Sequence, residues 1–285
     1  MGASTHGSRL HRLLELWKIY TWMDFLWVTR DLSSVVVIIV SDAIVSMTAA
    51  STTLLLAERF DGIGSWSKPQ IIFMLGYSML ANGLLEMFFG FNIKFISRRL
   101  GRGQLDHSLV QPEPLWVTLL TEGFLPFSGS ATLVTGLALL VWAGRRLALP
   151  VSAGWYGLLV LNIIASATIL LAFQFCWGSL AFWAPRAAEE INSSTSHLMS
   201  QLQPFPLEGV GPFLLSGLVT VVPVGLLGWY PCRALLGISP RGAGVVVTPL
   251  AALGAALLAV WIFRKGLVHY GHTGSQRYLA FGFRR

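Results

Sequence analysis

The sequence predicts an all-α polytopic membrane protein with six transmembrane helices, an N-terminal amphipathic interfacial helix and a re-entrant helical element before the last span. Of its 285 residues, 54% are hydrophobic and 12% are charged. The mean hydropathy of +0.65 is far above that of an ordinary soluble domain. Apolar runs of spanning length recur between short polar loops. The basic residues cluster in loops that one topology places on the same side.

Residues 1–31 are expected to precede the membrane domain, which takes up residues 32–285. Between residues 9 and 31, Leu, Trp, Tyr and Phe alternate with charged residues, a mixture that favours a helix lying among lipid headgroups. The same charges interrupt any apolar signal segment, so no cleaved signal peptide is expected.

The first two predicted spans, residues 32–57 and 70–91, both contain polar residues. Asp42 lies within the first span, where an ionised carboxylate is costly unless it faces protein or water. It could contact a substrate, bind a neighbouring helix, or lie nearer the membrane interface. Asn82 and Glu86 in the second span are four residues apart and therefore share a helical face, which we expect to point into the bundle.

The loop of residues 92–114 is the most basic segment of the chain, and it separates the second and third spans. It carries Lys94, Arg98, Arg99 and Arg102, followed by Asp106. Basic loops beside spanning helices remain in the cytoplasm. These arginines could also hold anionic lipid headgroups.

The second half of the chain contains further apolar runs. Residues 115–143 and 154–183 are predicted to be the third and fourth spans, and residues 245–263 the last. Residues 187–203 are polar enough that hydropathy alone assigns them to a cytoplasmic loop. Residues 204–240 contain many prolines, which predicts two short, broken helices and a re-entrant element.

The distribution of basic residues predicts the orientation. With six crossings and a cytoplasmic N-terminus, fourteen of the 20 Lys and Arg residues fall in the cytoplasm. The pair Arg145–Arg146 falls on the other side, against the trend. The net charge of +7 is thus explained by membrane orientation, without nucleic acid as a partner.

Several kinds of chemistry are not expected. No lysine follows a glycine, as a phosphate-binding loop requires. Glu189–Glu190 with the lone His197 lacks the spacing of a metalloprotease, and His269 with His272 lacks a third metal ligand. Cys176 and Cys232 do not make a disulfide framework. We therefore expect no catalytic residue, metal or cofactor in this chain.

Five segments of the chain form a recognisable pattern. They are residues 20–31 before the first span, GSWSKPQIIFMLGY from Gly64, RLGRGQLD from Arg99 with Leu109 and Pro112, GSLAFW from Gly178, and the proline-rich stretch 203–236. Together these segments resemble the permease subunits of type-2 ATP-binding-cassette (ABC) exporters. Arg102 and Gln104 depart from the usual residues of that family.

The resemblance implies a non-catalytic permease that works by alternating access in the cytoplasmic membrane, with both termini in the cytoplasm. Its implied partners are two ABC ATPase subunits, which bind ATP and Mg, and a second permease, identical or related. Residues 187–203 become the fifth span and 204–240 an external re-entrant segment. The implied coupling residues are Arg98, Arg99, Gly101, Arg102, Gly103, Leu105 and Asp106. The candidate pathway residues are Asp42, Asn82, Glu86, Asn192, Ser193, Ser196, His197 and Gln201.

The residues themselves leave a second class open, an ATP-independent channel or a scaffold subunit. They also leave open the cargo and the identity of the second permease. A pathway lined by amides and hydroxyls suits amphipathic or lipid-like cargo, antibiotics or glycans.

Overall fold

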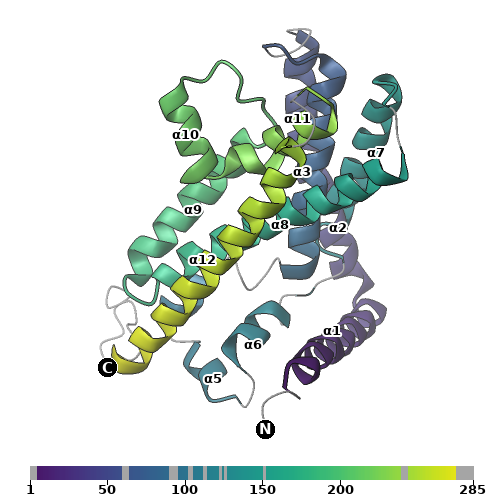
Figure 1. The fold of residues 1–285 in the computed structure, drawn as a ribbon. Helices are drawn as coiled ribbons and strands as arrows, with labels where there is room; N and C mark the ends of the chain where they lie inside the picture. Colours follow the sequence, from purple (N-terminus) through teal and green to yellow (C-terminus); the bar gives the residue numbers. More distant parts are fainter. Residues whose placement is uncertain are drawn as a thin grey trace.

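The computed structural model describes residues 5–59, 64–89, 96–101, 105–111, 114–121, 124, 127–149, 152–238 and 243–273. The secondary-structure elements of these residues are all helices, as predicted (Figure 1). They are α1 (Thr5–Arg30), α2 (Leu32–Arg59), α3 (Lys68–Phe89), α4 (Ile96–Gly101), α5 (Leu105–Leu109), α6 (Leu115–Thr121), α7 (Ser130–Arg146), α8 (Ala153–Leu180), α9 (Pro185–Leu202), α10 (Pro212–Thr220), the π-helix η1 (Gly225–Trp229), α11 (Tyr230–Leu235) and α12 (Ala243–Thr273).

Among the described helices, α2, α3, α8 and α12 are long and apolar enough to cross a membrane. A fifth span results if α10 is combined with η1 and α11. Helix α7 has only 17 residues, and α9 is rich in polar residues. The polytopic helical fold is therefore confirmed, whereas length and composition establish four or five spans in the described part of the chain rather than six.

Helix α3 lies at the centre of the bundle and is buried continuously from Ile71 to Met79. It packs against α7 with almost no side chain between the two backbones. A Cβ atom added to Gly76 would lie 2.7 Å from the carbonyl oxygen of Gly136. On another side, the Tyr77 hydroxyl shares a hydrogen bond of 2.8 Å with the Ser166 hydroxyl of α8. Helix α3 thus links the two halves of the bundle.

Helices α8 and α12 pack along each other, and a separate apolar cluster joins them beyond the end of α8. Phe182 is fully buried there against Phe263 and Tyr270. The backbone of Gly266 lies so close to Phe182 that an added Cβ would be 2.4 Å from its ring. Helix α12 therefore extends ten residues past the predicted end of the last span, because hydropathy detects the apolar part of a helix and not its polar extension.

The predicted third span, residues 115–143, was wrong as a single helix. The structure has α6 and α7 instead, with α7 starting at Ser130. The residue before it, Gly129, has a φ of 73°, a left-handed conformation that glycine adopts without strain and that cannot continue a right-handed helix. The segment is apolar on both sides of this break, so hydropathy joined the two helices.

The proline-rich stretch forms two short helical pieces, α10 and η1–α11, bent by 77° relative to each other. This agrees with the two broken helices that the prolines predicted. Before it, α9 is a helix of 18 residues rather than the loop that hydropathy alone suggested. In Figure 1, α10 and α11 lie toward one end of the bundle, and α5 and α6 lie at the other.

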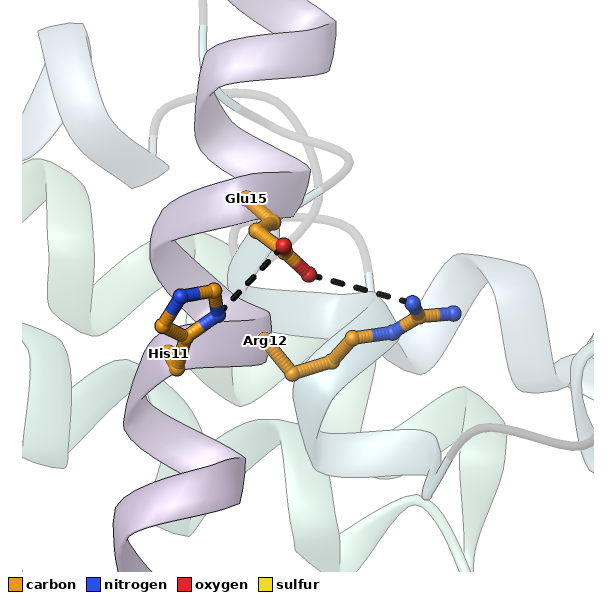
Figure 2. Close-up of polar contacts among 3 residues, drawn as sticks. All are labelled: His11, Arg12 and Glu15. Carbon is orange, nitrogen blue, oxygen red and sulfur yellow. Dashed lines mark ion pairs between the residues drawn. The ribbon is translucent and has the colours of Figure 1, made fainter.

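Helix α1 lies beside the end of the bundle that holds α6. Its Trp17 donates a hydrogen bond of 3.3 Å to the Leu120 carbonyl and packs against Phe88 and Phe89. The exposed part of α1 changes along its length: charged residues come first, with Glu15 near both His11 and Arg12 (Figure 2). Large apolar side chains are exposed farther along, namely Ile19, Trp22, Met23, Phe25 and Leu26. The helix therefore has the composition that suits a membrane interface.

Candidate functional site: a polar hollow and the loop at its end

Five helices, α2, α3, α7, α8 and α9, surround a hollow of about 460 Å³. Its lining is amphipathic. The polar lining residues are Asp42, Ser46, Ser78, Asn82, Glu86, Thr132, Gln174, Ser196, His197, Ser200 and Gln203. The apolar ones are Val45, Ala49, Leu75, Met79, Leu85, Leu170, Met199 and Pro204. No Lys or Arg of the described residues lines it.

Asp42 connects two walls of the hollow by capping the start of α7. Its carboxylate accepts hydrogen bonds from the Ala131 backbone N–H at 3.0 Å and from the Thr132 hydroxyl at 2.7 Å. The Ser46 hydroxyl, one turn farther along α2, donates to the same carboxylate at 3.4 Å. A negative charge at a helix N-terminus is favourable because unpaired N–H groups and the helix dipole meet there. Asp42 thus binds a neighbouring helix and also lines the hollow.

A chain of amides links α3 to the end of α9. Asn82 donates from Nδ2 to Oε1 of Gln203 at 2.9 Å, and the Ser78 hydroxyl donates to the Gln203 carbonyl at 3.4 Å. Gln203 is only 2% exposed. Its Nε2 has no hydrogen-bond partner among the described residues. An unpaired buried amide of this kind is energetically costly.

Helix α9 forms the wall that carries two hydroxyls, those of Ser196 and Ser200, and the imidazole of His197. Ser196 and His197 line the hollow, whereas Asn192 is buried on the inner side of the helix and accepts from the Ser196 hydroxyl at 3.4 Å. Ser193 and Gln201 are exposed, and Gln201 lies 3.0 Å from His197.

The eight candidate pathway residues therefore fall into two groups. Asp42, Asn82, Glu86, Ser196 and His197 line one hollow although they come from three helices. Asn192, Ser193 and Gln201 are not among its lining residues. That any of the eight contacts cargo stays a prediction.

Sequence reasoning missed the lining residues Gln174, Ser78 and Gln203. The first two are polar residues inside long apolar runs, which is the signal that did find Asn82. Gln203 lay at the boundary between two predicted segments, so its burial could not be anticipated.

The basic loop forms two short helices, α4 and α5, at the end of the bundle. Their apolar side chains are buried in one cluster: Ile96, Leu100 and Leu105 are each at most 1% exposed and pack with Phe182 and Tyr270. Gly178 at the end of α8 makes room for this packing, since an added Cβ would lie 3.1 Å from Ile96. Helix α4 thereby contacts both α8 and α9.

The predicted coupling residues take different positions in this loop. Arg99 is partly buried in α4, which ends at Gly101, and Leu105 begins α5 inside the cluster. Leu105 thus packs within the chain, and its role in coupling stays a prediction. Arg102 and Gly103 lie outside the described residues, as do the side chains of Arg98 and Asp106.

Within the described residues there is no group of three or more His, Cys, Asp or Glu side chains placed to hold a metal ion. His269 instead stacks on Trp183, with ring centroids 5.5 Å apart.

Apolar helices of spanning length define a multi-pass membrane protein, and in this chain they surround an amphipathic hollow. The family model described as ABC-2 family transporter protein matches residues 43–274, which is most of the chain. The chain therefore belongs to this family and is a type-2 ABC transporter permease, a membrane subunit of an ABC transporter. Permeases of this family are generally non-catalytic and work with ABC ATPase subunits. No curated protein and no solved structure matched the chain.

Proposed function

We propose that this chain is the permease of an exporter that moves cargo by alternating access, driven by ATP hydrolysis in separate subunits. Two ATPase copies would hold the ATP and Mg, and a second permease, identical or related, would complete the pathway. The chain itself would supply no catalytic residue and no cofactor. Its task would be to convert closure of the ATPases into movement of helices.

The observation that carries this proposal is the anchoring of the α4–α5 loop. The three buried residues Ile96, Leu100 and Leu105 join it to the ends of α8 and α12. A loop whose apolar face is packed in this way moves as one body with the helices it touches, because packed interiors transmit displacement. Its basic residues, Arg99 among them, would then meet the ATPase.

The exposed face of α9 supports a second permease. Along it lie Glu190, Ser193, Ser194, Ser200 and Gln201, all exposed in this single chain. Such side chains are unfavourable against lipid tails. A second subunit covering this face would close the pathway around the hollow.

The exposed apolar face of α12 supports an orientation with both termini in the cytoplasm. Leu250, Leu253, Leu257 and Trp261 are each more than half exposed along one side of the helix, and the exposed Arg264 and Lys265 follow directly. Trp followed by basic residues is typical of the cytoplasmic membrane boundary. We therefore place both termini in the cytoplasm and the chain in the cytoplasmic membrane.

The cargo proposed here is a small amphipathic molecule. A hollow of about 460 Å³ falls within the range of roughly 300–1,000 Å³ that holds drug-sized ligands. Its apolar walls would take the body of the molecule, and its amides and hydroxyls would take the polar groups.

The test is to express this chain with the proteins encoded beside it, to identify any ATPase that copurifies, and to measure ATP hydrolysis with and without the permease. The variant Arg99→Glu with Asp106→Ala should abolish the stimulation of hydrolysis by the permease. The matched control is Arg145→Glu, which changes an exposed arginine in the last turn of α7. It should leave the stimulation of ATP hydrolysis unchanged. Purification of a lone oligomer without any ATPase would instead support a channel or scaffold.

A further inference from the structure

The re-entrant element, α10 with η1 and α11, packs directly behind the wall of the hollow. A Cβ added to Gly228 of η1 would lie 2.7 Å from the Ser78 hydroxyl and 2.9 Å from the Gln203 carbonyl, and both of these residues line the hollow. The Ser166 hydroxyl also donates to the Leu226 carbonyl at 3.3 Å. Any outward movement of η1 therefore uncovers the lining at Ser78 and Gln203.

The element packs against α3, α8 and α12, and the Trp155 indole N–H of α8 donates a hydrogen bond of 3.1 Å to the Leu235 carbonyl of α11. One carboxylate ties it in addition to the turn between α2 and α3. Glu208 accepts a hydrogen bond from the Ser65 hydroxyl in the turn between α2 and α3. Its other oxygen lies 3.6 Å from Nε of Arg233 in α11. The Arg233 guanidinium in turn lies over the ring of Trp229, 4.9 Å from the centroid. One side chain thus joins three segments that are far apart in the sequence.

Two of these segments carry a glycine with a left-handed backbone next to the joining residue. Gly64 precedes Ser65 with a φ of 64°, and Gly209 follows Glu208 with a φ of 88°. Among the described residues other than its chain neighbours, no atom would lie within 4 Å of a Cβ at either glycine. Both positions thus have a backbone conformation that glycine adopts without strain, because glycine occupies left- and right-handed regions about equally.

The strength of the contact suits a reversible role. The side chains of Arg233 and Glu208 are 27% and 23% exposed, and a partly exposed ion pair of this kind contributes only modestly to stability. It can bias the position of the element without holding it permanently.

We propose that Glu208 is a latch that closes the re-entrant element over the hollow, and that the element opens when Glu208 separates from Ser65 and Arg233. This rests on the proposed transport function only for its purpose, because opening would release cargo at the end of the bundle away from α4 and α5. The latch itself can be tested in this chain without its partner subunits.

The first test measures opening without ATP or cargo. Cys232 lies in α11 and is 0% exposed, so it should react with a charged, water-soluble maleimide only when the element opens. In the full chain in nanodiscs, Glu208→Ala and Arg233→Ala should each accelerate labelling of Cys232 by about fivefold or more, as expected for a local opening reaction. The double variant Glu208→Arg with Arg233→Glu should return the rate toward that of the wild type.

The matched control is Glu58→Ala, which removes another ion pair, with Lys68, that does not touch the re-entrant element. It should leave Cys232 labelling unchanged. Labelling of Cys176 in α8, measured on its own peptide, should be the same in all variants. Wild-type labelling of Cys232 in Glu208→Ala overturns the latch. So does an equal rise at Cys176, because Glu208 would then hold the whole fold.

The second test uses the complete transporter. A disulfide between Ser65→Cys and Glu208→Cys should stop transport, and a reductant should restore it. A disulfide between Glu58→Cys and Lys68→Cys should have no effect. If the first test shows opening but the cross-linked transporter still moves cargo, Glu208 stabilises the element without gating it and the proposal is wrong. If no variant transports cargo under any condition, the proposed transport function fails while the labelling result stands.

Discussion

Replacing Asp42 by alanine should loosen the contact between α2 and α7. The change removes the carboxylate that accepts hydrogen bonds from the Ala131 N–H, the Thr132 hydroxyl and the Ser46 hydroxyl. It leaves the first N–H groups of α7 without this partner, on the wall of the hollow.

The expected loss can be estimated from the groups involved. Loss of a helix N-cap costs about 1 kcal/mol, and the favourable placement of a charge at a helix N-terminus is worth roughly 0.3–2 kcal/mol. Together with the hydroxyl left without its acceptor, Asp42→Ala should lower the free energy of unfolding by about 2–3 kcal/mol. Asp42→Asn keeps one acceptor oxygen and loses only the charge, so it should cost about 1 kcal/mol.

The assay is denaturant unfolding in detergent micelles, combined with hydrogen exchange of the α7 amides. Thr48→Ala, an exposed position on α2 whose hydroxyl bonds only within its own helix, is the control and should change stability by less than about 0.5 kcal/mol. Thr132→Val combined with Asp42→Ala should show a coupling energy of about 1 kcal/mol. The reasoning fails if Asp42→Ala is as stable as Thr48→Ala, or if Asn at this position is as harmful as Ala.

Three further predictions follow from close contacts and one exposed carboxyl. Gly76→Ala should destabilise the fold by at least about 2 kcal/mol, because its Cβ meets backbone atoms of α7. The Cβ of Gly254→Ala meets no described atom within 4 Å, so this variant should stabilise the fold by about 0.5–1 kcal/mol. Thermal unfolding measures both. Gly266→Ala should displace Phe182 and reduce ATPase stimulation in the assembled transporter. Hydrogen bonds from Ser34 and then Ser33 lower the pKa of the exposed Asp31 carboxyl below its usual 3.8. The stabilisation that Asp31 gives to the start of α2 should therefore be complete above pH 3.8 and be lost as the pH falls toward the lowered pKa. Amide exchange at Ser34 measures this loss.

Specific outcomes would contradict each of these predictions. Equal melting temperatures for Gly76→Ala and Gly254→Ala would mean that α3 and α7 can separate freely. Unchanged stimulation in Gly266→Ala would show that the Phe182 cluster does not affect the ATPase. Amide exchange at Ser34 that is independent of pH after correction for intrinsic rates would show that Asp31 does not cap α2.

The long helices could be predicted because an apolar run of spanning length has few alternatives in a membrane. The break before α7 could not, since it depends on the left-handed conformation of Gly129 within a segment that stays apolar. Helix α9 was recognised only through the family resemblance, because its polar composition resembles that of a loop. The far end of α12 was missed since Arg264 and Lys265 mark a membrane boundary and not the end of a helix.

Part of the hollow could also be predicted. Asp42, Asn82 and Glu86 were identified because polar groups in apolar spans need partners or water. Which partners they have could not be deduced, since Asp42 and Ala131 are 89 residues apart in the sequence and meet only through the break before α7. Burial of Leu105 was likewise hidden, because its loop is the most basic segment of the chain.

The position of α4 has a consequence for how the walls of the hollow move. Helix α4 follows α3 in the chain, yet it contacts α8 and α9, so a force applied to α4 would pass to both α8 and α9. The wall that holds Ser196 and His197 would then be displaced while Asp42, tied to α7, stays in place. The wall formed by α9 would then move relative to the wall formed by α2 and α7. The volume of the hollow would change while α2 and α7 keep their contact.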